Sequence, residues 1–157
     1  TLIEGDFSKK IIDLSNEKVD TIISLSCIDW NDDFDQSIKL IKDFCQINKT
    51  DFIFTFRAAK HGVNNSNHSF QYVNYNNIKE GEIATYVVLS YKHLKETIKS
   101  FKPCSVNIYA YKRAPSSVAV TPYKELIFGC VWLRGCYRNS EVNDINIVGK
   151  LPSDLIL

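Results

Sequence analysis

The sequence predicts an α/β fold built on a mostly parallel sheet that ends in an antiparallel pair of strands. Strand-like and helix-like segments alternate over residues 19–57, and this alternation is the repeating unit of a parallel sheet. The first strand-like run is almost continuously apolar, as in strands that are buried on both faces. Towards the C-terminus two strand-like segments follow one another without a helix between them, so we expect them to pair antiparallel.

Length and composition are those of one globular domain. The chain has 157 residues, of which 45% are hydrophobic and 24% are charged, and this is enough for a core of ordinary size. The formal net charge is only +1, whereas nucleic-acid binders usually carry a basic patch, so we expect no nucleic-acid partner. No apolar run approaches the roughly 20 residues that span a bilayer, and we expect no membrane partner.

The cysteines indicate a reducing, cytoplasmic setting. They are odd in number, scattered and without metal-ligand spacing, so we expect buried free thiols and neither a disulfide framework nor a metal site. The chain also contains no methionine and opens inside a strand-like segment, which favours a part of a longer polypeptide. The five cysteines are Cys27, Cys45, Cys104, Cys130 and Cys136.

Residues 19–57 define the central strand–helix–strand unit. The strand-like run 20–26 leads into a turn rich in Asn and Asp, residue types that cap helix N-termini. Apolar residues then recur near a period of 3.6, which predicts a helix that ends at residues 48–50. The run 52–56 predicts the next strand. In open α/β sheets ligands bind beyond the carboxyl ends of such strands, so we expect the site there.

The second half of the chain begins with an insertion at about residues 58–89. Its segments 69–75 and 83–89 read as the two arms of a hairpin, and an insertion of this kind often forms a lid or a pocket wall. Ser90 is expected to cap a helix over residues 91–101.

Two strands, 105–112 and 125–133, follow the second helix, and residues 143–148 predict a final edge strand. Periodicity leaves residues 8–18 open between a short helix and a loop.

The order of these segments resembles the second half of a class I, S-adenosylmethionine-dependent methyltransferase, whose Rossmann-like domain is a three-layer sandwich. In this resemblance the chain opens at the third strand of the family and runs to its seventh. The passages that carry it are Glu4–Phe7, Val19–Trp30, Thr50–Arg57 and the strand pair 105–112 and 125–133.

The resemblance implies a contiguous sheet order of fourth, fifth, seventh and sixth strands. It also implies that residues 1–157 are one partial methyltransferase-like domain with a lid at about residues 58–89. The glycine-rich loop and the acidic residue that hold the cofactor in the family follow its first and second strands, which this chain does not include.

The resemblance also implies a cofactor, S-adenosylmethionine, and residues that contact it. By position Asp6 would accept a hydrogen bond from the adenine amino group, and the backbone amide of Phe7 would meet the ring. Ser24, Leu25 and Ser26 would line the cofactor. A solvated Gly-Asp turn and ordinary strand burial explain the same residues without a cofactor.

The catalytic and substrate-binding candidates follow the two central strands. Asp29 and Trp30 stand where such enzymes place a side chain near the methyl group, and a carboxylate there could orient or deprotonate an acceptor. A helix N-cap requires the same residue type as Asp29. Arg57 could bind an anionic substrate through its planar fork, and a surface ion pair is the alternative.

The insertion adds further candidates. His61 and His68 could each act as a base, although loop histidines are more often simply solvated. Tyr72, with Tyr75 and Tyr86, could wall a substrate pocket or pack the lid.

The resemblance thus implies methyl transfer to a small-molecule or glycan-type acceptor. The alternative is a methyltransferase-like binding or scaffold module without catalysis. A hydrolase would need a serine on a strained turn, and no G-x-S-x-G elbow occurs. Oligomeric state stays open.

Overall fold

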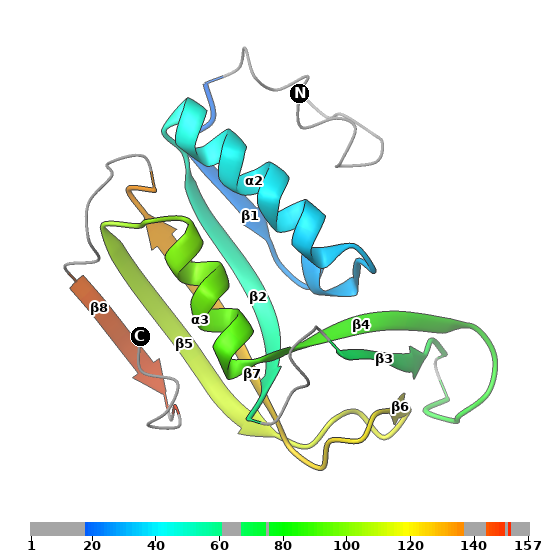
Figure 1. Cartoon of the computed structure of the whole chain (residues 1–157). Helices are drawn as coiled ribbons and strands as arrows, with labels where there is room; N and C mark the ends of the chain where they lie inside the picture. The colour runs from blue at the N-terminus through cyan, green and yellow to red at the C-terminus, as the bar shows by residue number, and fades with distance from the viewer. Residues whose placement is uncertain (1–17, 61–66, 75, 137–143, 150, 152–157) are drawn as a thin grey trace.

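The computed structural model describes residues 18–60, 67–74, 76–136, 144–149 and 151. Eight strands form one mixed sheet in the order β6-β3-β4-β2-β7-β5-β8, and β1 pairs with β2 beside this path (Figure 1). The elements are β1 Thr21–Ser24, η2 Ile28–Trp30, α2 Phe34–Asn48, β2 Asp51–Ala59, β3 Asn67–Tyr72, β4 Ile83–Ser90, α3 Tyr91–Ser100, β5 Ser105–Arg113, β6 Ala119–Val120, β7 Leu126–Arg134 and β8 Asp144–Gly149.

The central strands pair as the sequence predicts. β1 and β2 are parallel neighbours, and helix α2 connects them. β7 lies between β2 and β5 and is antiparallel to both, so β5 runs in the same direction as β2. The contiguous order β1-β2-β7-β5 is therefore the order that the resemblance implies for the fourth, fifth, seventh and sixth strands. The predicted edge strand is present as β8, which pairs with β5.

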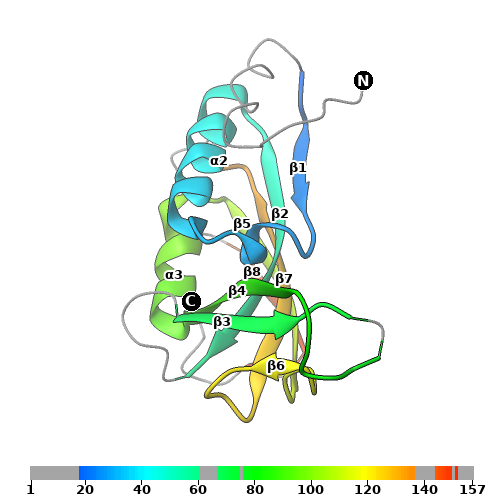
Figure 2. The same ribbon diagram turned by 90° about the vertical axis from the view of Figure 1, so that its right-hand side faces the viewer.

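Both helices cover the same face of the sheet (Figure 2). On this face β2 contributes Phe52, Phe54 and Phe56, all at most 1% exposed, and the first two rings stack with centroids 4.9 Å apart. α2 and α3 bury their apolar stripes against this row of rings. The described residues thus form two layers, and the α/β class is confirmed, while the third layer of the expected sandwich stays a prediction.

The opposite face of the sheet exposes large apolar side chains. Tyr109 is 59% exposed, Tyr111 46% and Trp132 38%. They alternate with the core residues of β5 and β7, because successive side chains of a strand point to opposite faces. No helix of the described ranges covers this face.

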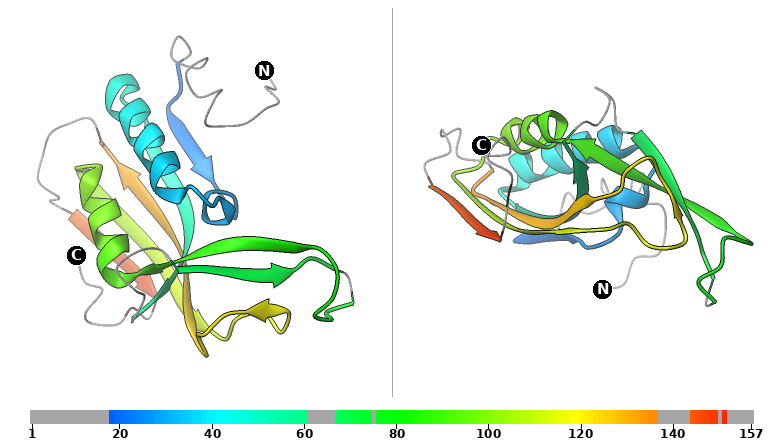
Figure 3. Two further views of the ribbon diagram at one scale, coloured as in Figure 1. Left: turned by 45° about the vertical axis from the view of Figure 1, so that its right-hand side comes forward. Right: turned by 90° about the horizontal axis from the view of Figure 1, so that it is seen from below.

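The insertion forms an antiparallel hairpin of β3 and β4, as predicted, and β6 extends it (Figure 3). The hairpin returns to the main sheet only where Leu89 and Ser90 pair with the last two residues of β2. The Ser90 hydroxyl then accepts a hydrogen bond from the His93 backbone N–H at 3.0 Å, which confirms the predicted cap of α3.

Two local expectations are corrected. α2 begins after Asp33, but no Asp33 side-chain cap bond forms; instead the Asn31 side-chain oxygen accepts a hydrogen bond from the Asp33 backbone N–H. Arg57 does not end its strand, because β2 continues to Ala59, where it pairs with β4. In the described part of the chain, neither helix has the length and apolarity that crossing a membrane requires.

Candidate functional site

The sheet forks at β2, and the site lies in the fork. One edge of β2 pairs with β7 along most of its length. The other edge pairs with β1 over residues 51–54 and with β4 only at residues 58–59. Residues 55–57 are left between the two diverging strands, and the short helix η2 packs there against β2 and β4. The divergence of neighbouring strands at their carboxyl ends is where α/β sheets form ligand crevices.

Ser26 begins the turn into this fork. Its φ of 48° lies in the left-handed region, which is uncommon for residues other than glycine. Its backbone N–H donates a 2.6 Å hydrogen bond to the Thr55 hydroxyl, which holds the turn on β2. The predicted strand over residues 20–26 therefore ends early, at Ser24, and Ser26 lies on a turn that contacts a residue 29 positions away in the sequence.

Asp29 and Arg57 form an ion pair inside the fork. The Arg57 guanidinium donates to Oδ2 of Asp29, and their side chains are only 13% and 5% exposed respectively. Oδ1 of Asp29 is buried and has no hydrogen-bond partner among the described residues. Asp29 lies within η2 and not at the N-cap of α2, which excludes the capping role considered for it. The ion pair of Arg57, expected at the surface, is buried.

Aromatic rings enclose the Arg57 guanidinium. Its central carbon lies 4.6 Å from the ring centre of Trp30, 4.7 Å from that of Tyr86 and 5.9 Å from that of Phe128. A desolvated guanidinium against aromatic faces gains about 2 kcal/mol per good contact. The Tyr86 ring in turn meets Trp30 edge-on at 5.5 Å. Arg57 is thus held in one orientation, which fixes the Asp29 carboxylate that it binds.

Burial decides the protonation chemistry of Asp29. Loss of water raises the pKa of its carboxyl above the ordinary value of 3.8, and the positive charge of Arg57 opposes this shift. A carboxyl with a raised pKa is better suited to accept and return a proton near neutral pH than a solvated one. Perturbed carboxyls of this kind cluster at functional sites.

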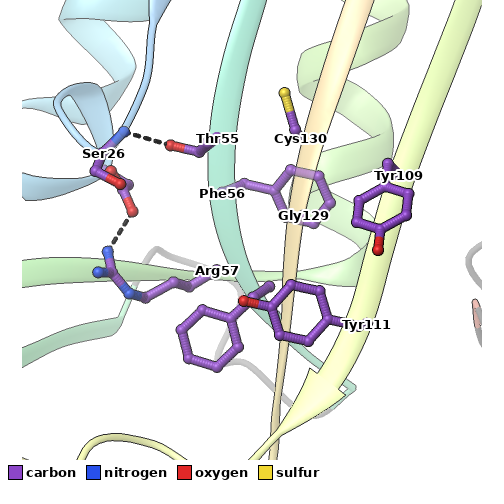
Figure 4. Close-up of a pocket in the computed structure, with 10 residues that line it drawn as sticks. Ser26, Thr55, Phe56, Arg57, Tyr109, Tyr111, Gly129 and Cys130 are labelled. Atoms are coloured by element: carbon purple, nitrogen blue, oxygen red, sulfur yellow. Dashed lines mark hydrogen bonds and ion pairs between the residues drawn. The ribbon is translucent and has the colours of Figure 1, made fainter. Parts of the chain in front are cut away.

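A hollow of about 190 Å³ opens from this ion pair onto the uncovered sheet face (Figure 4). Three strands supply its floor, and in the close-up Tyr109 and Tyr111 stand on β5 across from Thr55 and Arg57 on β2. Its polar side consists of Ser26, Thr55 and the Asp29–Arg57 pair. The lining residues are Ser26, Asp29, Thr55, Phe56, Arg57, Tyr109, Tyr111, Phe128, Gly129 and Cys130.

A second hollow of about 150 Å³ lies between β1 and α2. Ser24 lines it, and the Ser24 hydroxyl accepts a 3.1 Å hydrogen bond from the Ile28 backbone N–H. Ser26 lines the first hollow, and Leu25 is 57% exposed. The three residues predicted to line one cofactor surface are thus divided between two hollows and solvent.

The other predicted residues contribute less to this site. Asp6, Phe7 and His61 lie outside the described residues. His68 lies on β3, where it pairs with β4. Tyr72 ends β3, and its ring packs edge-on against Phe70 at 6.1 Å, so it does not line either hollow.

Sequence reasoning missed most of the aromatic floor, namely Tyr109, Tyr111 and Phe128, together with Thr55. The signal was present in β5, since the alternation of residues 105–112 places its tyrosines on one face. The sequence does not say that this face stays open, or that β7 brings Phe128 beside it.

A comparison of the chain with models of protein families finds no match. A comparison with curated proteins likewise finds no similar sequence.

Proposed function

We propose that this chain carries the fourth to seventh strands of a class I methyltransferase domain and takes part in S-adenosylmethionine-dependent methyl transfer to a small-molecule or glycan-type acceptor. The observation that carries the proposal is the insertion of antiparallel β7 between parallel β2 and β5. This topology agrees with the order implied by the sequence resemblance. Both helices on one face agree with the same half of such a domain.

The described residues fit one wall of an active site. The orphaned Oδ1 of Asp29 is a buried acceptor without a donor, which is costly unless a ligand supplies one. When bound, S-adenosylmethionine would supply the electrophilic methyl group, and its sulfur would keep the electron pair of the carbon–sulfur bond that breaks. Asp29 would accept the proton that an acceptor hydroxyl loses as its oxygen gains the methyl carbon, and Arg57 would hold the carboxylate in place. Such displacement depends chiefly on positioning, and the aromatic enclosure of Arg57 serves that purpose.

Isothermal titration of the native polypeptide with S-adenosylmethionine tests the proposal. We expect saturable binding, and methyl transfer that Asp29→Asn lowers by about 100-fold or more in kcat with cofactor affinity unchanged. A folded protein that gives no heat at millimolar cofactor would refute the proposal.

One observation favours the second candidate, a methyltransferase-like binding module without catalysis. The hollow beside Asp29 measures about 190 Å³, less than the roughly 300–1,000 Å³ of most small-molecule sites, so it holds too little space for a cofactor and an acceptor together at this carboxyl. Cofactor binding without methyl transfer to any acceptor, and an Asp29→Asn variant indistinguishable from the native protein, would favour the binding module.

A further inference from the structure

The hollow at the ion pair adjoins a larger one. This neighbour has a volume of about 590 Å³ and shares two of its lining residues, Tyr111 and Phe128, with the first. The two rings stack at 5.9 Å with an interplanar angle of 20°, and they line both hollows, which therefore adjoin. We call the two adjoining hollows the fork groove. Its far half is lined by Asn77, Arg113, Ala114, Pro115, Ser116 and Ser117.

The two ends of the fork groove differ in charge. At one end the Asp29 carboxylate is paired with Arg57, and Ser26 and Thr55 line the hollow with this pair; Oδ1 of Asp29 is buried and has no hydrogen-bond partner among the described residues. At the other end stand Arg113 and the hydroxyls of Ser116 and Ser117. The structure shows no ion pair for Arg113 within the described ranges, whereas its neighbour Lys112 pairs with Glu125 at 3.0 Å. The Arg113 guanidinium therefore remains available to an anion from outside the chain.

Strand geometry sets the length of the fork groove. Arg57, Phe128 and Tyr111 face one another across three neighbouring strands, which puts the outer two about 10 Å apart. Arg113 lies two residues beyond Tyr111 on β5, about 7 Å further along the strand. The backbone positions of Arg57 and Arg113 are therefore roughly 12 Å apart, the scale of a small molecule.

We propose that the fork groove binds an anionic sugar, with its ring against the tyrosines and its phosphate or carboxylate on Arg113. A pyranose ring has an apolar face and a rim of hydroxyls, which matches a floor of exposed tyrosines rimmed by a carboxylate and two hydroxyl side chains. Arg113 offers the planar fork that binds phosphate and carboxylate. This inference deepens the proposed function, on which it rests for the role of Asp29, by assigning its acceptor class.

The test measures binding without S-adenosylmethionine, so its outcome is independent of the cofactor titration. The probes are the 6-phosphates of glucose, mannose and galactose, each compared by calorimetry with its parent sugar and with inorganic phosphate at one ionic strength. We expect at least one sugar phosphate to bind about tenfold or more tightly than both its parent sugar and phosphate.

Two variants locate the anion. Arg113→Gln should weaken binding of that sugar phosphate about tenfold and leave the parent sugar unaffected. Lys112→Gln is the matched control, because it removes the same charge from the adjacent residue on the other face of β5. It should change the affinity less than about twofold. Circular dichroism checks that both variants are folded.

Three results would overturn the inference. They are no preference for any sugar phosphate over its parent sugar, inorganic phosphate that binds as tightly as the sugar phosphate, or equal losses in Arg113→Gln and Lys112→Gln. Failure of the cofactor titration with success here would reject methyl transfer while keeping the sugar site.

Discussion

The guanidinium of Arg57 and the carboxylate of Asp29 form a buried ion pair that bridges the fork of the sheet. Arg57 belongs to β2, and Asp29 belongs to the short helix that follows β1, so the pair joins two segments 28 residues apart. Aromatic rings from η2, β4 and β7 surround the same guanidinium. This one cation thus links four elements, and the hollow of the candidate site is built against it.

Removing the cation should destabilise the fold strongly. Arg57→Gln leaves the Asp29 carboxylate buried without a countercharge, and we expect a loss of about 3–5 kcal/mol in the free energy of unfolding. The double variant Asp29→Asn with Arg57→Gln should recover part of this loss, because the stranded charge is gone. Urea unfolding of the four proteins of this cycle measures the coupling.

Arg134→Gln is the control for that cycle. Arg134 also stacks on an aromatic ring, with its central carbon 4.8 Å from the Trp132 centroid, but it is exposed. Its loss should cost about 0.5–1 kcal/mol. If Arg57→Gln and Arg134→Gln lowered the free energy of unfolding equally, the buried ion pair would stabilise the fold no more than the exposed contact does.

The stability of the protein should depend on pH through Asp29. Burial raises its pKa in the folded state above the ordinary value of 3.8, so between these two pKa values the folded state binds more protons than the unfolded state. The contribution of Asp29 to the free energy of unfolding is therefore fully present below pH 3.8, and it is lost as the pH rises through the pKa of Asp29 in the folded state.

Asp29→Asn isolates this contribution because the amide does not titrate. We expect the free energy of unfolding of the native protein, minus that of the variant, to fall as pH rises from 3.8 towards neutrality. A difference that grows with pH over this range would show that Arg57 outweighs burial and lowers the pKa of Asp29.

Gly129 should tolerate no side chain. A Cβ at this position of β7 would lie 2.4 Å from Cζ of Phe56 and 3.0 Å from Cβ of Ala110. The Phe56 ring is buried between strand and helices, so it has little room to move. We expect Gly129→Ala to cost about 1–3 kcal/mol, as overpacking does in other cores.

Thermal or urea unfolding checks this expectation against two variants. Cys130→Ala alters the adjacent residue on the open face and should cost less. Phe56→Leu combined with Gly129→Ala should cost less than the sum of the single changes, because the smaller side chain makes room for the methyl group. Strict additivity would contradict the proposed clash.

The cysteines should differ widely in reactivity. Cys27 is exposed, whereas Cys45 and Cys136 are buried, and burial raises the pKa of Cys136 to about 12. Only the thiolate attacks alkylating reagents, so iodoacetamide at neutral pH should modify Cys27 first and leave Cys136 unmodified until the protein unfolds. Mass spectrometry of timed samples measures the order, and early labelling of Cys136 would contradict its burial.

Local patterns predicted most of the elements correctly. The 3.6-residue period marked α2, Ser90 marked the start of α3, and the missing helix between the last two long strands predicted their antiparallel pairing. The site was predicted in part, since Asp29, Trp30 and Arg57 do meet at the carboxyl ends of neighbouring strands. Tyr72 packs on Phe70 and lines none of the hollows described above, so its role in substrate binding stays a prediction.

The sequence by itself determined the strand–helix–strand order and the types of residue at the strand ends, because periodicity and capping are local properties of the chain. Only the tertiary structure decided that Ser26 adopts a left-handed turn on Thr55, that Oδ1 of Asp29 is buried without a partner among the described residues, and that Phe128 and Tyr111 line two adjoining hollows. These facts depend on register between strands distant in sequence. Cross-strand contacts arise from packing of the whole sheet, and no local pattern encodes them.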